Sequence, residues 1–304
     1  MTQLRYGHDS TIITKDLLVA VEIGINSPEG LIPVIPKYVS CRESKWKRKK
    51  LSFCRIISEY GPYGISDAIK SSKIKMLYDP IYRIKMPYIK KEDIMIYNNP
   101  KDVFMENFIY SYKYIESLPL FDLIKDLDIK QIGITGSYSL GMQYGESDID
   151  LVIYGEKNVE LIYNKFINNT NIIECKNSFG GVIIDDLCVP WRRGTYRGKA
   201  YSWTGVPNEI ASHCDPIKDY NKIIIPDKVE NLNVYIPNGQ INGLLYPPCV
   251  RDSNGRYIIS FEFNAGYLLY NGGHLSISGL SNEKSIIIGT REFPGKISKI
   301  GSKS

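Results

Sequence analysis

Two aspartates, Asp148 and Asp150, begin an apolar run, and their spacing indicates chemistry more directly than any other feature of the sequence. Because successive side chains of a strand point to opposite faces, both carboxylates should emerge on one face, while Ile149 and Leu151 face the core. Two adjacent carboxylates repel each other unless a cation lies between them. Carboxylate oxygens suit Mg²⁺ that is shared with substrate phosphates. The pair therefore predicts a site for Mg²⁺ (or Mn²⁺).

Gly136 and Ser137 precede these aspartates and follow the apolar residues 132–134. A glycine allows a sharp turn and a close approach of the backbone to a ligand. Ser137 would begin a helix over residues 138–144, and the free backbone N–H groups of a helix start can bind phosphate. Gly145 would end that helix. We therefore expect a strand, a Gly-Ser turn, a short helix and a second strand that begins at the aspartates.

The pattern of an apolar strand, Gly-Ser, about ten residues and Asp-x-Asp resembles the signature of the polymerase-β-like nucleotidyltransferase superfamily. The layout is also similar to an archaeal group of predicted nucleotidyltransferases, in which β-rich regions flank the catalytic core on both sides. The resemblance implies an α+β fold with a minimal core of mixed sheet and helices. It implies a nucleoside triphosphate such as ATP as substrate, held by Gly136 and Ser137. Asp148 and Asp150 would then be catalytic metal ligands.

A third carboxylate is the next requirement, since two-metal phosphoryl transfer places ions about 4 Å apart. Residues 182–189 form the one acidic apolar strand downstream, and Asp185 and Asp186 would point to opposite faces of it. Asp186 is favoured as a catalytic metal ligand, because the following Leu-Cys-Val-Pro resembles the family pattern. The family usually carries a single acid there, so the doublet leaves the choice open.

Two basic segments could contact anionic substrates. Arg192 and Arg193 open a Gly-spaced basic stretch that could hold the triphosphate or acceptor phosphates, although an exposed basic loop has the same pattern. Residues 45–50 read KWKRKK. They could clamp a phosphate backbone and stack a base on Trp46. The alternative is a solvated hairpin tip with the aromatic ring packed back on the core.

The chain divides into three expected regions. Residues 1–100 should be β-rich, residues 101–206 should form the nucleotidyltransferase core, and residues 207–304 should form a second β-rich region whose short strands suggest a small barrel. Helical spacing appears over residues 102–127 and again over residues 158–166. Short strands separated by Gly-containing turns follow in the last region, one of them over residues 266–270.

Composition sets broad limits on function. The formal net charge of +5 permits an anionic partner without requiring one. No apolar run is long enough to span a membrane, so we expect no membrane partner and a cytoplasmic protein. The six cysteines show no C-x-x-C spacing, and reduced thiols are therefore expected.

These observations predict a metal-dependent nucleotidyltransferase that moves a nucleoside monophosphate from a triphosphate to an acceptor hydroxyl, with nucleic acid as the expected acceptor. One alternative is a non-catalytic nucleic-acid-binding module that kept the fold. Another is an AMP transferase that modifies a partner protein.

Overall fold

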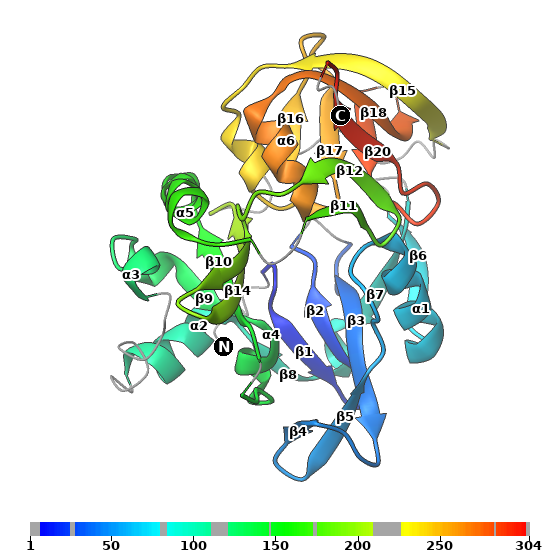
Figure 1. The fold of residues 1–304 in the computed structure, drawn as a ribbon. Coiled ribbons are helices and arrows are strands. Elements are labelled where there is room, and N and C mark those ends of the chain that lie inside the picture. The colour runs from blue at the N-terminus through cyan, green and yellow to red at the C-terminus, as the bar shows by residue number, and fades with distance from the viewer. Residues whose placement is uncertain are drawn as a thin grey trace.

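The computed structural model describes residues 7–24, 28–79, 84–110, 121–145, 147–172, 175–208, 226–282 and 284–301, apart from the side chain of Asp186. Within these ranges the chain is a mixed α+β protein with three sheets (Figure 1). The N-terminal sheet lies at the lower right of the view, a small central sheet at the left, and the C-terminal sheet at the top.

The N-terminal sheet is antiparallel and includes the strand order β4-β5-β3-β2-β1-β8, while β7 pairs with both β3 and β6. Both faces of its inner strands are covered, since every residue of β1 and β2 is buried. A helix, α1 (Pro62–Ser72), connects β5 to β6. The strands are β1 (Thr11–Thr14), β2 (Val19–Glu22), β3 (Leu31–Cys41), β4 (Trp46–Arg48), β5 (Leu51–Arg55), β6 (Lys75–Asp79), β7 (Ile84–Lys90) and β8 (Ile94–Asn98).

The central sheet has the order β13-β14-β10-β9, in which β10 and β14 run parallel and the other neighbours run antiparallel. Its strands are β9 (Ile132–Ile134), β10 (Ile149–Tyr154), β13 (Arg193–Tyr196) and β14 (Lys199–Val206). The helices beside it are α2 (Pro100–Phe104), α3 (Phe121–Ile124), α4 (Gly136–Leu140) and α5 (Glu156–Asn169). The helix expected over residues 158–166 is thus confirmed as part of α5. The helical stretch expected over residues 102–127 is present at both ends, and residues 111–120 lie outside the described part.

The C-terminal sheet branches at β18, which pairs with β15 along one edge and with β20 and then β19 along the other. From β20 the sheet continues through β12 to β11, and from β19 it continues through β17 to β16. Within the described residues, β11 and β16 do not pair with each other. The expected barrel is therefore an open sheet. Its strands are β11 (Lys176–Phe179), β12 (Val182–Leu187), β15 (Asp227–Ile236), β16 (Cys249–Arg251), β17 (Tyr257–Ser260), β18 (Gly273–Asn282), β19 (Ser285–Ile288) and β20 (Lys296–Lys299).

Two expectations for the later chain are wrong. The strand expected over residues 266–270 is a helix, α6 (Gly266–Asn271), which buries Leu268 and Leu269. A short apolar run does not by itself distinguish a strand from a buried helix. The hairpin β11–β12, expected in the core, instead joins the C-terminal sheet through the pairing of β12 with β20.

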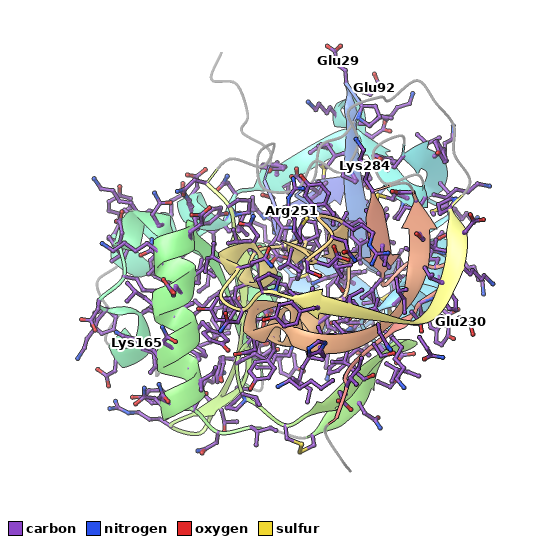
Figure 2. All side chains as sticks on the ribbon, turned by 90° about the horizontal axis from the view of Figure 1, so that it is seen from above. Glu29, Glu92, Lys165, Glu230, Arg251 and Lys284 are labelled. Carbon is purple, nitrogen blue, oxygen red and sulfur yellow. A yellow bond between two sulfur atoms is a disulfide. The ribbon has the colours of Figure 1, made fainter. Side chains whose placement is uncertain are left out.

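One hydrophobic core connects the three sheets. It includes Met86 of the N-terminal sheet, Leu151 of the central sheet, and Phe263 and Ile287 of the C-terminal region, all buried. Charged side chains such as Glu29 and Glu230 are exposed and project from the periphery (Figure 2). No helix within the described residues is long and apolar enough to cross a membrane.

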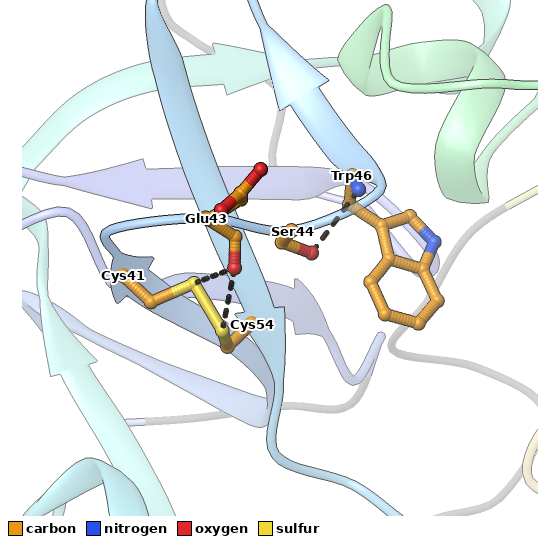
Figure 3. The surroundings of a disulfide bond; sticks show 5 residues. All are labelled: Cys41, Glu43, Ser44, Trp46 and Cys54. Carbon is orange, nitrogen blue, oxygen red and sulfur yellow. Dashed lines mark hydrogen bonds between the residues drawn. A yellow bond between two sulfur atoms is a disulfide. The ribbon is translucent and has the colours of Figure 1, made fainter.

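The expectation of reduced thiols is wrong, because disulfides join Cys41 to Cys54 and Cys175 to Cys188. The first joins β3 to β5, and both sulfurs lie 3.6 and 3.8 Å from the carbonyl oxygen of Glu43 (Figure 3). Cysteine spacing alone did not reveal this pairing, because the register of the paired strands decides which cysteines are neighbours. In the β3–β5 pair Val39 is opposite Cys54, and Cys41 lies two residues beyond Val39 on the same strand.

Replacing both Cys41 and Cys54 by serine should lower the free energy of unfolding by about 3 kcal/mol, because the bond closes a loop with a sequence separation of 13 in the unfolded chain. Urea denaturation without reductant measures this difference. With reductant present, variant and wild type should unfold alike. The variant with serine at Cys175 and Cys188 is the matched control, since its bond spans the same separation. An unchanged midpoint in the Cys41/Cys54 variant would contradict the assigned bond.

Candidate active site

The strand–turn–helix–strand arrangement expected around the aspartates is confirmed. Strand β9 leads through Thr135 into helix α4, and β10 follows with Ile149 and Leu151 buried. The helix is shorter than expected. It ends at Gly141, which has a φ of 63° in the left-handed region, and not at Gly145. Glycine suits this position because it has no Cβ, so the left-handed backbone conformation costs it no steric strain.

Gly136 is required by its distance to Asp150. Its φ is 65°, and a Cβ built at this position would lie 2.2 Å from Oδ2 of Asp150. A side chain here would therefore displace the carboxylate. The glycine of the Gly-Ser pair allows the start of α4 to approach the second aspartate directly.

The carboxylate of Asp150 lies in a row of side chains that crosses three strands. Arg193 on β13 is opposite Ser202 on β14, and Ser202 is opposite Asp150 on β10. The hydroxyl of Ser202 donates a hydrogen bond to Oδ1 of Asp150. Burial and, next, the charge of Asp148 raise the pKa of Asp150, while Lys37, Ser202 and Arg193 act in the opposite direction.

Lys37 comes from β3 of the N-terminal sheet and was not expected in the site. Burial disfavours its charge, but the neighbouring Tyr60, Asp150 and Asp9 outweigh that effect and raise the pKa of its ammonium group. Nζ donates a hydrogen bond of 3.4 Å to the hydroxyl of Tyr60. The available signal was a single lysine in the apolar strand LIPVIPKYV, where an unpaired charge would be costly.

Tyr60 is surrounded by cations. Besides Lys37, the guanidinium carbons of Arg193 and Arg55 lie 5.1 and 5.7 Å from the centroid of its ring. These distances allow cation–π attraction. The N-terminal region thus brings Lys37 and Arg55 to the edge of the central sheet, beside Arg193 of that sheet.

A cavity of about 120 Å³ brings the predicted residues together. Gly136, Ser137, Asp148 and Asp150 all line it, and Lys37 lines it as well. Residues from two sheets therefore face one space that carries two carboxylates, a serine hydroxyl and an ammonium group. This arrangement can bind a polyphosphate together with a cation.

The strand expected to supply a third carboxylate, β12, belongs to the C-terminal sheet. β12 pairs with β11 and β20 in the C-terminal sheet, whereas the parallel neighbour of β10 is β14. Asp185 accepts a hydrogen bond of 3.0 Å from the backbone N–H of Lys299. The side chain of Asp186 lies outside the described part of the chain, so its role as a metal ligand stays a prediction. Opposite Asp150, β14 carries the hydroxyl of Ser202.

The two arginines differ in their surroundings. Arg192 is buried, donates hydrogen bonds to the carbonyl oxygen of Trp203 and to Oδ1 of Asn264, and stacks on Phe263. Burial lowers the pKa of Arg192 to about 9. Arg193 is exposed beside Tyr60. Arg193 is therefore placed to contact an anion in the site. Arg192 is held in the protein interior by its hydrogen bonds and by its contact with Phe263.

The basic segment 45–50 forms the tip of the β4–β5 hairpin. Trp46 is half-buried and packs against Tyr38 and Tyr144, with ring centroids 5.6 and 6.5 Å away. The guanidinium Nε of Arg48 donates to the carbonyl oxygen of Leu140 at the end of α4. Of the two interpretations, the structure agrees with the packed hairpin, and the hairpin supports the Gly-Ser helix.

The donors present suit one magnesium ion. Mg²⁺ is commonly bound by one or two carboxylates together with substrate phosphates, and Asp148 and Asp150 offer such a pair on one cavity. Lys37 already balances part of the charge of Asp150. Within the described residues, no group of three or more His, Cys, Asp or Glu side chains could hold an ion. The described side chains thus fit an ion that phosphates help to bind.

Comparison with known families agrees with the geometry. Residues 120–227 match the family model of the nucleotidyltransferase domain. The matched segment includes β9, α4, β10 and β14, and therefore Gly136, Ser137, both aspartates and Ser202. No curated protein and no solved structure matches the chain significantly. The chain thus contains a segment of the nucleotidyltransferase type, and the sheets on either side of it lie largely outside the match.

Gly136→Ala should destabilise the protein more than Gly141→Ala. Both positions have a left-handed φ and should each lose about 1 kcal/mol of unfolding free energy. Only Gly136 adds a clash, since a Cβ at Gly141 meets no atom within 4 Å. Urea denaturation of both variants measures the difference. In an Asp150→Ala background the extra cost of Gly136→Ala should vanish, and its persistence would show that the clash with Asp150 is not the cause.

Glu22, the buried last residue of β2, should make the free energy of unfolding fall as the pH rises. Burial raises its pKa to about 7 from 4.5, although the hydroxyl of Tyr97 donates a hydrogen bond to it. Between pH 4.5 and 7 the folded protein holds a proton that the unfolded chain has released, so this group lowers the unfolding free energy by up to about 3 kcal/mol over that range. Glu22→Gln should remove this slope, whereas Glu29→Gln, at an exposed position, should retain it. Equal slopes in both variants would contradict the assignment.

Proposed function

We propose that the chain is a nucleotidyltransferase that moves a nucleoside monophosphate from a nucleoside triphosphate such as ATP to an acceptor hydroxyl. The observation that supports this most is the shared cavity of Gly136, Ser137, Asp148 and Asp150 inside the segment that matches the nucleotidyltransferase domain. Phosphoryl transfer of this kind needs positioning and charge neutralisation more than covalent chemistry. The residues that line the cavity have the types for both tasks.

Asp148 and Asp150 would hold Mg²⁺ or Mn²⁺. When bound, the ion neutralises phosphate charge and lowers the pKa of an attacking hydroxyl. Ser137 would donate a hydrogen bond to a phosphate oxygen. Lys37 would keep a positive charge beside the phosphates, because its pKa is raised by the anionic groups around it. Ser202 holds one oxygen of Asp150 in place through its hydroxyl.

Nucleic acid as the acceptor remains a prediction. Exposed basic side chains at the hairpin tip and at Arg193 support it. Trp46 packs against Tyr38 and Tyr144, remains half-buried and lines the cavity of the two aspartates. Transfer to nucleic acid should weaken steeply as salt is added, whereas transfer to an uncharged acceptor should change little.

A second candidate is the non-catalytic binding module. It is favoured by one observation, the hydroxyl of Ser202 on the strand beside Asp150, where a third carboxylate would complete a two-ion site. Such a module would bind a nucleoside triphosphate and Mn²⁺ through Asp148 and Asp150 without transferring the nucleotide. The AMP transferase that modifies a partner protein differs from the main proposal only in its acceptor.

Asp150→Asn should reduce transfer at least about 100-fold, because the variant loses the charge that would hold the ion. The assay offers α-labelled nucleoside triphosphates with Mg²⁺ or Mn²⁺ to RNA, DNA, total protein and small hydroxylated compounds. Asp227→Asn is the matched control and should retain activity, because Asp227 is exposed on β15 and does not line the cavity of the site.

The outcomes separate the candidates. Label in one fraction that is lost in Asp150→Asn supports the transferase and identifies the acceptor class. Nucleotide binding without label in any fraction supports the binding module. Mn²⁺ affinity that survives the combined Asp148→Asn and Asp150→Asn substitutions would reject the metal site itself.

A further inference from the structure

A second cavity, of about 170 Å³, adjoins the candidate active site. All three sheet regions contribute to its walls, so it exists only when the regions are packed together. Residues that line it include Glu22 of β2, Ile35 of β3, Met86 of β7, Asp150 of β10, and Glu262 and Phe263 ahead of α6.

The two cavities meet at the predicted reaction centre. Asp150, Lys37 and Tyr60 line both of them. Ser137 and Asp148 belong to the lining of the smaller cavity alone. A transferase must bring two substrates together at one point, and here the phosphate-binding residues lie in one cavity while a second cavity opens onto the same carboxylate.

The size of the second cavity limits what it can hold. An engineered apolar cavity of about 150 Å³ binds benzene. A space of about 170 Å³ therefore accommodates one ring-sized group.

The walls of the second cavity combine apolar carbon with buried carboxylates. Met86 and Phe263 are buried, and Ile35 is half-buried. Glu22 and Glu262 are both buried, with 5% and 6% of their surface exposed. Such groups can form hydrogen bonds with hydroxyl or amino groups of a ligand.

Glu262 retains an oxygen for a ligand. Within the described residues, the hydrogen bonds to its side chain come from the backbone and side-chain nitrogens of Asn264, at 3.0 and 2.6 Å, and both end on Oε1. Arg192, the buried cation nearby, already donates to Trp203 and Asn264. The other arginines of the lining, Arg193 and Arg291, are exposed. The interior therefore favours a ligand with hydrogen-bond donors.

We propose that this cavity binds the acceptor, and that the acceptor is a small hydroxylated ring compound whose hydroxyl groups reach Glu22 and Glu262. The assignment rests on the proposed function. In the transfer, the acceptor oxygen bonds to the α-phosphorus of the triphosphate, and the bond from that phosphorus to the bridging oxygen breaks. Pyrophosphate leaves, and the proton of the hydroxyl passes to solvent.

The test uses the full chain, α-labelled ATP with Mg²⁺, and three probes: adenosine, myo-inositol and glucosamine. A DNA and an RNA oligonucleotide serve as competing acceptors. Ile35→Trp fills the second cavity from a half-buried position. Val39→Trp is the matched control, because Val39 is also half-buried on β3 and does not line the cavities described above. Thermal unfolding of both variants checks that they fold.

We expect label on at least one probe, with the rate reduced at least tenfold in Ile35→Trp, unchanged in Val39→Trp, and with the same ATP dissociation constant in all three proteins. ATP binding that weakens in Ile35→Trp by the factor by which transfer falls would overturn the proposal, because the cavity would then hold the nucleotide. Transfer to an oligonucleotide alone, at the wild-type rate in Ile35→Trp, would also overturn it.

Binding of the probes, measured by saturation-transfer NMR, separates the two levels of the argument. Transfer to oligonucleotides without probe binding would reject the assignment of the cavity and leave the nucleotidyltransferase intact. Absence of transfer to every acceptor would reject the proposed function and, with it, the acceptor role of the cavity, even where a probe binds in a manner that depends on Ile35.

Discussion

The partly buried carboxylate of Asp150 requires compensating groups from more than one region of this protein. A carboxylate removed from water must be compensated by hydrogen bonds or opposite charge. Here the compensation comes from Ser202 on the neighbouring strand and from Lys37 on the N-terminal sheet. Gly136 must lack a side chain for the same carboxylate to fit. The central sheet therefore presents this group only in combination with a sheet that lies outside the matched nucleotidyltransferase segment.

That dependence explains why the flanking regions are extensive. The N-terminal region supplies Lys37, Arg55 and Tyr60 to the site. Arg48 of its β4–β5 hairpin donates a hydrogen bond to the end of the helix that carries Ser137. The C-terminal region supplies Phe263 and Glu262 to the second cavity. One continuous hydrophobic core connects all three. The flanking sheets thus form parts of the site in addition to stabilising the central sheet.

The same packing changes the meaning of the basic residues. Positive charge near the sequence motif suggested contacts with a nucleic-acid backbone, but Arg192 is buried against Phe263, and Trp46 is packed between aromatic neighbours. The charges that face the small cavity, Lys37 above all, come from a strand that is mainly apolar. Charge close to a motif in sequence is therefore a weaker guide here than charge brought to it by a neighbouring sheet.

The sequence by itself determined the local elements of the site: strand β9, the Gly-Ser turn, the strand with two aspartates on one side, and helix α5. Each follows from period, turn chemistry and spacing within about forty residues. Tertiary structure alone decided which strand lies beside β10, since β12 joins β20 and β14 takes that place with Ser202. It also decided the position of Lys37, the disulfide between Cys41 and Cys54, and the open form of the C-terminal sheet. Strand pairing over long sequence separations depends on which faces of the whole molecule are buried together, and a pattern of neighbouring residues does not record it.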